Sequence, residues 1–247
     1  MRLKFICCEL FTRMACLATA FSKNTIDLQF APIKLHVEPE KLRAGLQEII
    51  DTTEASSEDY DAIVLGFGLC GNGTSGLKSE KFKMVIPRTH DCCALTLGSS
   101  EAFVENFEHR LSAEWSSHGF AERDDDGFAD TDMHKSMGYD MSYADMVEKY
   151  GEENAQYVWE TLHPVMPDMP HIYIEVDGFE NNGLFERFKE KAAEKDAENG
   201  CHKEIETLTG SMRLFTKLLD GDWDDEFLIV EPGKEIEPNY DLLRVFV

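Results

Sequence analysis

The sequence predicts an α/β protein with a mostly parallel sheet built from Rossmann-like βα units, three layers thick and arranged in one lobe or two. Two observations predict this class. Short apolar runs bounded by glycine, proline or acidic residues are typical of strands that helices cover on both faces. Stretches with apolar residues at helical spacing separate these runs along the chain. Such alternation favours parallel strands joined by right-handed crossovers.

The elements of the first half have separate sequence signals. The apolar run "DAIVLGFG" ends in glycine and "FKMVIP" ends at Pro87, as central strands do. The stretch "EPEKLRAGLQEII" places Pro39 in the first turn of a helix and continues with apolar residues at i, i+3 and i+4. We therefore expect strands at 2–7, 25–32, 61–68 and 82–87, and helices at 8–22, 38–56 and 91–110, the last interrupted near "GSS".

Between residues 110 and 145 the regular pattern fails, and a stretch of that length is either a functional excursion or an insertion. Its aromatic side chains predict a lid over a flat ligand or a small satellite core: Trp115, His118, Tyr139 and Tyr143. Regular structure resumes with helices at 143–162, 183–200 and 211–223 and strands at 171–179, 203–210 and 226–233. We expect an N-terminal α/β lobe at 1–119, an irregular insertion at 120–150 and a C-terminal α/β portion at 151–247, or one continuous domain.

The charge of the chain excludes some partners. Lys and Arg number 24 against 48 Asp and Glu, which gives a net charge of -24. A field of this sign repels phosphate backbones and anionic membranes, so we expect neither nucleic-acid nor membrane binding. This negative net charge also suits a cytoplasm of high salt, where charge repulsion is screened. Glu9 and Arg13 interrupt the apolar stretch near the N-terminus, which argues against a signal peptide and favours a cytoplasmic protein.

Cysteines follow three strands of the predicted sheet. Cys7 and Cys8 follow the first strand, Cys70 follows "AIVLGFG", and Cys92 follows "MVIPRTHD" together with His90. Because carboxyl ends of parallel strands share one edge, these loops can converge. Cys8, Cys70 and Cys92 predict a metal site, with zinc as the first choice and an iron–sulfur cluster or a corrinoid as alternatives. Whether Cys7 or Cys8 supplies the first thiol of this site remains open.

The loop "GFGLCGNG" surrounds Cys70. It satisfies G-x-G-x-x-G, but its strand is the third of the chain and a new strand follows soon after, so a dinucleotide site is the weaker interpretation. Its glycines indicate close approach of the backbone to a bound group. The candidate cofactor-binding residues are Gly68, Gly71, Asn72 and Gly73.

"PRTHDCC" supplies the candidate catalytic residues. His90 titrates near neutral pH and is a candidate for proton transfer or for a fourth metal ligand. Arg88 is a candidate for binding a small anionic ligand, since a guanidinium recognises carboxylate or phosphate. Asp91 completes the set. The alternative for Arg88 is an ion pair with Asp91 or another local acid.

Four stretches together resemble the domain-of-unknown-function family 1638: "ICCEL", "DAIVLGFGLCGNGTSGL", "VIPRTHDCCALTLGS" and "GSMRLFTKLLDGDWDDEFLIVEPG". The matching positions are Cys8, Glu9, Cys70, Asn72, His90, Asp91 and Cys92. The resemblance implies a methanogen or anaerobic bacterium and a setting of corrinoid-dependent methyl transfer.

Three functions therefore remain open. The first is a metal-dependent enzyme or accessory factor of anaerobic one-carbon metabolism, with components of a corrinoid methyltransferase as partners. The second is a non-catalytic binding module for a corrinoid, a metal or a small anionic ligand. In the third, the cysteines only pack the core of an interaction protein.

Overall fold

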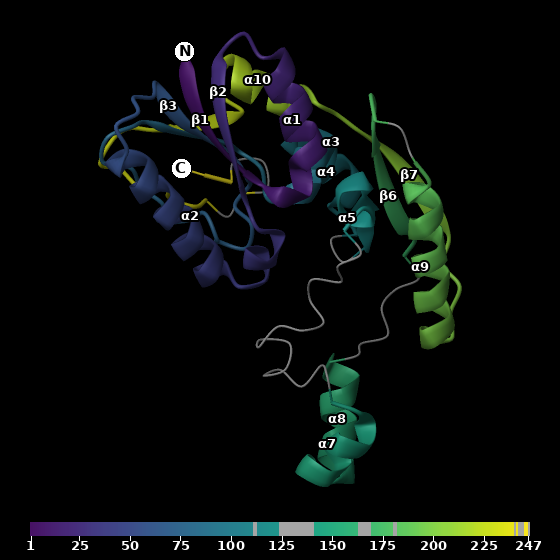
Figure 1. Cartoon of the computed structure of the whole chain (residues 1–247). Helices are drawn as coiled ribbons and strands as arrows, with labels where there is room; N and C mark the ends of the chain where they lie inside the picture. The colour runs from purple at the N-terminus through teal and green to yellow at the C-terminus, as the bar shows by residue number, and fades with distance from the viewer. Residues whose placement is uncertain are drawn as a thin grey trace. The chain divides into compact units, whose positions relative to one another are not determined.

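A computed structural model of the chain describes residues 1–110, 113–123, 141–162, 169–179, 182–239, 241 and 245–246. The chain forms two compact units, one of Met1–Asp124 with Pro170–Val247 and one of Asp125–Met169. The predicted fold class is confirmed, because the larger unit is α/β with a mostly parallel five-stranded sheet and a second, parallel three-stranded sheet (Figure 1).

The first sheet has the strand order β2-β1-β3-β4-β8. The strands β1 to β4 pair in parallel, and β8 pairs antiparallel with β4. All residues of β3 and β4 are buried, as their uninterrupted apolar sequences require of central strands. The bounds are β1 Arg2–Cys8, β2 Thr25–Ala31, β3 Ala62–Gly66, β4 Met84–Pro87 and β8 Phe227–Val230.

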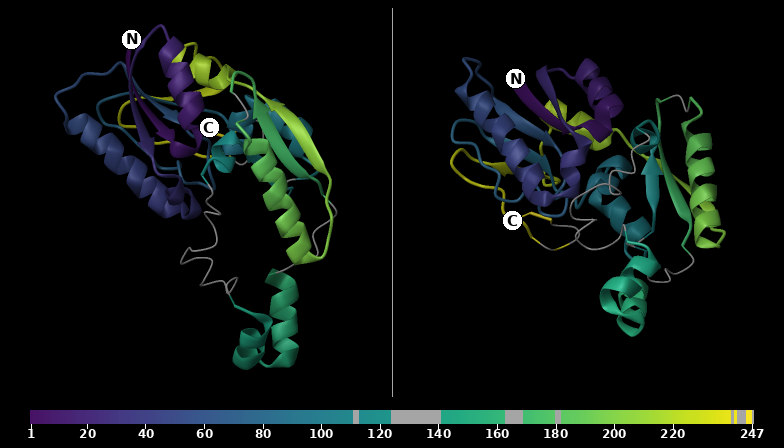
Figure 2. Two further views of the ribbon diagram at one scale, coloured as in Figure 1. Left: turned by 45° about the vertical axis from the view of Figure 1, so that its right-hand side comes forward. Right: turned by 60° about the horizontal axis from the view of Figure 1, so that its bottom comes forward.

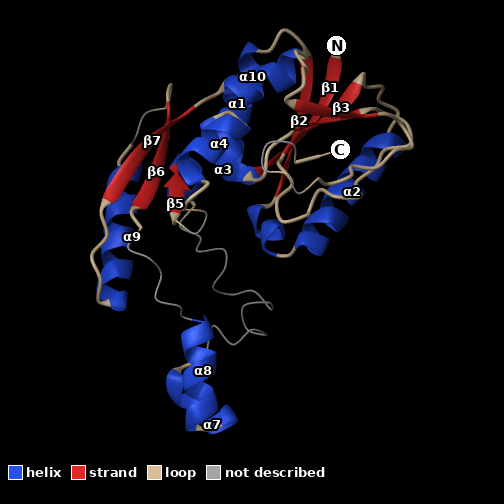
Figure 3. Ribbon diagram, turned by 180° about the vertical axis from the view of Figure 1, so that it is seen from behind, coloured by secondary structure: helices blue, strands red, loops and turns tan. Residues whose placement is uncertain are grey.

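Helices cover both faces of the first sheet. Helices α1 (Thr12–Phe21) and α10 (Arg213–Asp220) lie on one face, and α2 (Pro39–Ala55) lies on the other (Figures 1 and 3). Helix α2 buries Leu42, Leu46 and Ile50, which recur at helical spacing and form its apolar face. A short helix, η2 (Ile33–Val37), precedes α2. The core of the unit therefore lies between this sheet and its two helical layers.

The order of the first three strands creates a switch point. The chain runs from β1 to β2 on one side of β1, then crosses to β3 on the other side. Right-handed crossovers in opposite directions place α1 and α2 on opposite faces of the sheet. In open α/β sheets, ligands bind beyond the carboxyl ends of the strands where the order reverses. Here that place lies between the ends of β1 and β3.

The second sheet has the order β5-β6-β7, with all pairs parallel. Helix α9 covers one of its faces, and α3 and α4 lie on the other (Figures 2 and 3). The chain then returns through α10 to add β8 to the first sheet. The bounds are α3 Cys92–Leu97, α4 Ser100–Phe107, β5 Trp115–Ser117, α5 His118–Ala121, β6 His171–Val176, α9 Leu184–Asn199 and β7 Ile205–Gly210.

The smaller unit contains α7 (Tyr143–Tyr150) and α8 (Glu152–Leu162), which confirms the predicted helices at 143–162. A capping box between Ser142 and Asp145 begins α7, and Gly151 with φ of 76° ends it. Of the predicted insertion at 120–150, residues 124–140 lie outside the described residues, and Tyr139 is among them. Among the helices that the structure describes, none combines the length and apolarity needed to cross a membrane.

Candidate thiol site at the switch point

The three predicted thiols lie at the carboxyl edge of the first sheet. Cys8 is the last residue of β1, Cys70 lies in the loop after β3, and Cys92 is the first residue of α3, soon after β4. Burial is the main cause of the raised pKa of Cys70 and Cys92, and neighbouring groups add to it: Cys8 raises the pKa of Cys70, and Asp91, Cys70 and Cys8 raise the pKa of Cys92. Such electrostatic effects require that the three side chains lie near one another. The cluster therefore lies at the switch point of the sheet.

Cys7 faces away from this cluster. Its side chain is fully buried beside Gly66, its neighbour in the register between β1 and β3. A Cβ atom at Gly66 would come within 2.6 Å of Cys7 Sγ, so only glycine leaves room for that thiol. Successive side chains of a strand point to opposite faces. The structure thus favours Cys8, rather than Cys7, as the thiol from β1.

Burial keeps these thiols protonated. The exposed fractions of Cys8 and Cys70 are 5% and 4%, and removal from water is the largest cause of the raised pKa of all three thiols. The pKa of Cys8 rises to about 11, because the nearby Arg123 and a hydrogen bond to the Leu10 backbone only partly offset its burial. Since the thiolate is the reactive form, these are not nucleophiles as they stand.

The loop after β3 holds Cys70 in a strained conformation. Cys70, Gly71 and Asn72 have φ values of 48°, 60° and 72° in succession. A left-handed conformation costs an L-residue about 1–2 kcal/mol, and only Gly and Asn adopt it readily. Gly71 and Asn72 therefore suit their positions, whereas Cys70 does not. A strained residue in such a loop is a sign of function.

The glycines of the loop permit close backbone packing. Gly68 lies against the chain after β4, where a Cβ atom would come within 2.7 Å of Thr89 O and 2.9 Å of Asp91 N. Cys70 N donates a hydrogen bond to His90 O at 3.0 Å. A Cβ atom at Gly73 would overlap Leu42 on α2 at 2.5 Å. In the described residues between β3 and β4, no helix follows the loop, so it lacks the helix of a dinucleotide site.

Asp91 joins His90 to the start of α3. Its Oδ1 accepts hydrogen bonds from Cys93 N at 2.8 Å and Ala94 N at 3.2 Å, which caps the helix. Its Oδ2 lies 3.2 Å from His90 Nδ1, and this hydrogen bond raises the pKa of His90. The His90 ring also stacks on Phe103 of α4, with 5.6 Å between ring centroids. His90 is 44% exposed, so it borders the site at the surface.

Arg88 contacts the C-terminal segment. Its Nη1 donates a hydrogen bond to Phe246 O, and its backbone N–H donates to Glu226 O at 2.7 Å. Its carbonyl accepts from Ser100 Oγ at 2.6 Å. The bond to Phe246 ties the end of β4 to the C-terminal segment, a contact that the sequence pattern did not indicate.

Two oxygens at the same edge are buried and have no hydrogen-bond partner among the described residues. They are Thr89 Oγ1, on a residue that is 2% exposed, and Asn72 Oδ1. A buried polar atom without a partner costs about 1–3 kcal/mol, which calls for an explanation such as a bound group. The sequence pattern indicated Asn72 but not Thr89. The position of Thr89 between two selected residues of "PRTHDCC" was the available signal.

Arg123 connects the second sheet to the segment after Cys8. From the end of α5 its Nη1 donates to Glu9 Oε1 at 2.8 Å. Its Nη2 donates to Glu9 O at 2.6 Å and to Thr12 Oγ1 at 2.8 Å. Glu9 belongs to the short helix η1 (Glu9–Phe11). Nothing in the sequence pattern around Arg123 indicated this contact.

The described aromatic residues of the irregular stretch each pack against a different aromatic ring. Trp115 packs against Phe120 with 5.2 Å between ring centroids. His118 stacks on Phe179 at 4.8 Å. Tyr143 belongs to the smaller unit, where it contacts Trp159 at 5.6 Å. Each ring thus has an aromatic neighbour.

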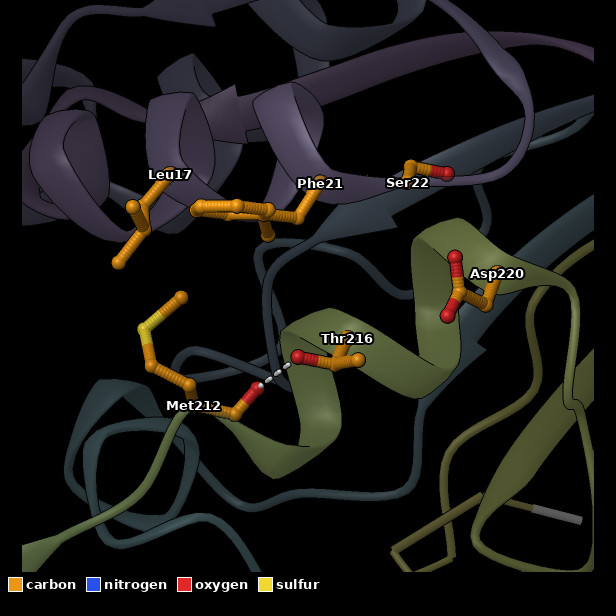
Figure 4. A pocket seen from close by; sticks show the side chains of 7 residues that line it. Leu17, Phe21, Ser22, Met212, Thr216 and Asp220 are labelled. Carbon is orange, nitrogen blue, oxygen red and sulfur yellow. Dashed lines mark hydrogen bonds between the residues drawn. The ribbon is translucent and has the colours of Figure 1, made fainter.

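Two surface hollows lie among other residues. One of about 280 Å³ lies between α1 and α10, where the apolar side chains of Leu17, Phe21 and Met212 face it (Figure 4). A second, of about 430 Å³, is lined by residues of α2 with Gly76 and Lys78. Neither is lined by the three thiols. Among the described residues, no three or more His, Cys, Asp or Glu side chains are arranged to hold a metal ion.

Residues 30–219 match the model of the family described as "Protein of unknown function (DUF1638)". No curated protein and no solved structure matches the chain significantly. The matched range includes Cys70, Cys92 and the loops around them, whereas Cys8 precedes it.

Proposed function

Because the chain belongs to the DUF1638 family, whose description states no activity, we propose a function from the site itself: the protein binds a thiophilic metal ion through Cys8, Cys70 and Cys92. One observation carries the proposal. Three thiols from three successive strand ends lie near one another at the switch point, where α/β sheets bind ligands. The strain at Cys70 and the partnerless Thr89 hydroxyl support it.

The donor set fits zinc best. Zinc takes cysteine sulfur in tetrahedral sites, and three thiolates also suit an iron–sulfur cluster with one further ligand. The described side chains are not arranged to hold a metal as they stand, so loading requires the thiols to turn toward one point. It also replaces their protons, because a metal ion deprotonates a coordinating thiol. Metal binding should therefore release protons and strengthen with pH.

Three protein thiolates leave the fourth coordination position of a tetrahedral metal ion open for a further ligand. In an enzyme, a substrate occupies it, and His90 with Asp91 lies at the surface beside the site. The metabolic setting we propose, cytoplasmic methyl transfer with corrinoid-dependent partners, derives from the resemblance of the motifs. A corrinoid would itself colour the protein. Within the described residues no disulfide joins two cysteines, in keeping with a reducing compartment.

A second candidate is a carrier that holds a metal or corrinoid without turning over a substrate. The burial of Cys8 and Cys70 favours it, because an enzyme must admit its substrate to the metal. Turnover of a methyl donor by the loaded protein would support the enzyme. Tight metal retention without turnover would support the carrier.

Elemental analysis and a visible spectrum of protein purified without oxygen test the proposal. We expect about one zinc per chain, or the absorption of an iron–sulfur cluster or corrinoid. The variants Cys8→Ser, Cys70→Ser and Cys92→Ser should lose the metal. Cys16→Ser and Cys201→Ser are matched controls, because these cysteines are exposed, and they should retain it. A wild-type protein without metal after anaerobic loading, or a Cys70→Ser variant that binds as tightly, would contradict the proposal.

A further inference from the structure

Helix α1 is apolar on its outer face as well as on its inner face. Its inner face buries Met14, Ala15 and Ala18 in the core beside the first sheet. The residues of its outer face are also uncharged and mostly apolar: Cys16, Leu17, Ala20 and Phe21. No charged residue stands between Arg13 and Lys23. A helix that is apolar all round is typically buried, so we expect a further surface to cover the outer face of α1.

Phe21 protrudes from this outer face. The residue is 81% exposed, and none of the large apolar residues that the structure describes is more exposed. Phe21 and Leu17, together with Met212 just before α10, border the hollow of about 280 Å³ between the two helices (Figure 4). A cavity of about 150 Å³ is enough to hold benzene, so this hollow has room for a phenylalanine ring. One patch of surface therefore carries both a protruding ring and a hollow that accepts a ring.

The charge of the chain favours a second copy as the occupant of this hollow. Each chain carries a net charge of -24, so two copies repel one another across their acidic surfaces. At this patch the repulsion is weak, because α1 is uncharged and the carboxylate at the rim has a basic neighbour. Asp220 Oδ1 accepts a hydrogen bond from Lys23 N at 3.2 Å, and Lys23 Nζ pairs with Asp222 at 3.0 Å. A basic partner, in contrast, gains no electrostatic attraction from an uncharged helix.

We propose that the outer face of α1 and the hollow beside it form the contact of a homodimer with twofold symmetry, in which Phe21 of each copy packs into the hollow of the other. A twofold contact joins the same patch of both copies, so it needs protruding and receiving groups on one surface. Cys16 and Ala20 are small, which lets the two α1 helices approach closely at the symmetry axis. This inference is independent of the proposed metal binding.

Sedimentation velocity over a range of protein concentrations tests the contact. We expect a monomer–dimer equilibrium that shifts toward the dimer in about 1 M salt, where a Debye length of about 3 Å screens the repulsion between the acidic chains. Phe21→Asp should weaken dimerisation about tenfold or more, as is typical of a central aromatic residue in an interface. Tyr157→Asp is the matched control, because Tyr157 is 73% exposed but belongs to the smaller unit, and it should dimerise like the wild type.

Cys16 reports the same contact in the wild-type chain. Cys16 and Cys201 are both exposed, but the proposed contact covers only Cys16. A thiol reagent should therefore modify Cys16 more slowly as the protein concentration rises, whereas the modification rate of Cys201 should stay constant. Mass spectrometry of the digested protein separates the two rates.

Loss of the dimer in Phe21→Asp, with protection of Cys16 in the wild type, supports the proposal. A wild-type protein that stays monomeric in high salt overturns it and assigns the outer face of α1 to a different partner. A dimer that tolerates Phe21→Asp and leaves Cys16 unprotected overturns this surface as its contact. Because Phe21 is largely exposed, Phe21→Asp should keep the circular dichroism of the wild type. If it does not fold, the protection of Cys16 decides.

Discussion

Replacing Cys70 by Gly or by Ala tests whether the thiol loop is strained. At a φ of 48°, any side chain with a Cβ atom costs about 1–2 kcal/mol, and glycine avoids this cost. Glycine loses more backbone freedom than alanine on folding, and this loss offsets about 0.4–1 kcal/mol of the stability gained by relieving the strain. Cys70→Gly should therefore be more stable than Cys70→Ala by roughly 0.8 kcal/mol. Both variants lack the thiol, so its lost contacts cancel in the comparison.

Urea unfolding of metal-free protein measures this difference. The matched control is the same pair at Cys93, which is fully buried and is the second residue of α3. There the order should reverse, with Cys93→Ala more stable than Cys93→Gly by about 1 kcal/mol. If Cys70→Ala equals or exceeds Cys70→Gly in stability, the left-handed conformation of Cys70 is wrong, and with it the argument from strain to function.

Two further changes test other contacts. Gly119→Ala should lower stability by about 1–3 kcal/mol, since its methyl group overlaps the backbone of η1; an unchanged thermal midpoint would refute the close approach. Asp196→Asn should lower it by about 1–3 kcal/mol at pH 7, because the carboxylate accepts from Lys203 N and contacts His171. These bonds, with the Lys203 backbone first, lower the pKa of Asp196 to about 2. The contribution of the Asp196 carboxylate to the free energy of unfolding is present above the unfolded pKa near 4 and is lost as pH falls toward 2. The stability of Asp196→Asn should therefore fall less between pH 4 and pH 2 than that of the wild type. Parallel stability curves for the two proteins would refute this role of Asp196.

Local sequence was sufficient for most strands and helices of the larger unit. The runs "AIVLG" and "MVIP" are apolar throughout and end in Gly or Pro, and such signals act within a few residues. The strand β5 was not predicted. It has only three residues, "WSS", so it shows no periodicity and depends on its partner β6. Its residues pair with Ile172–Ile174 of β6, more than fifty positions further along the chain.

For the candidate site, the sequence determined which loops carry thiols and that glycines surround Cys70, because strand ends and turn residues are local features. Only the tertiary structure decided that Cys8 rather than Cys7 belongs to the cluster, that Arg88 contacts Phe246, and that Gly119 packs against Leu10. These contacts join residues more than a hundred positions apart or depend on the pairing of strands. Sequence patterns report the local conformation of the chain, whereas packing between distant segments determines which side chains meet.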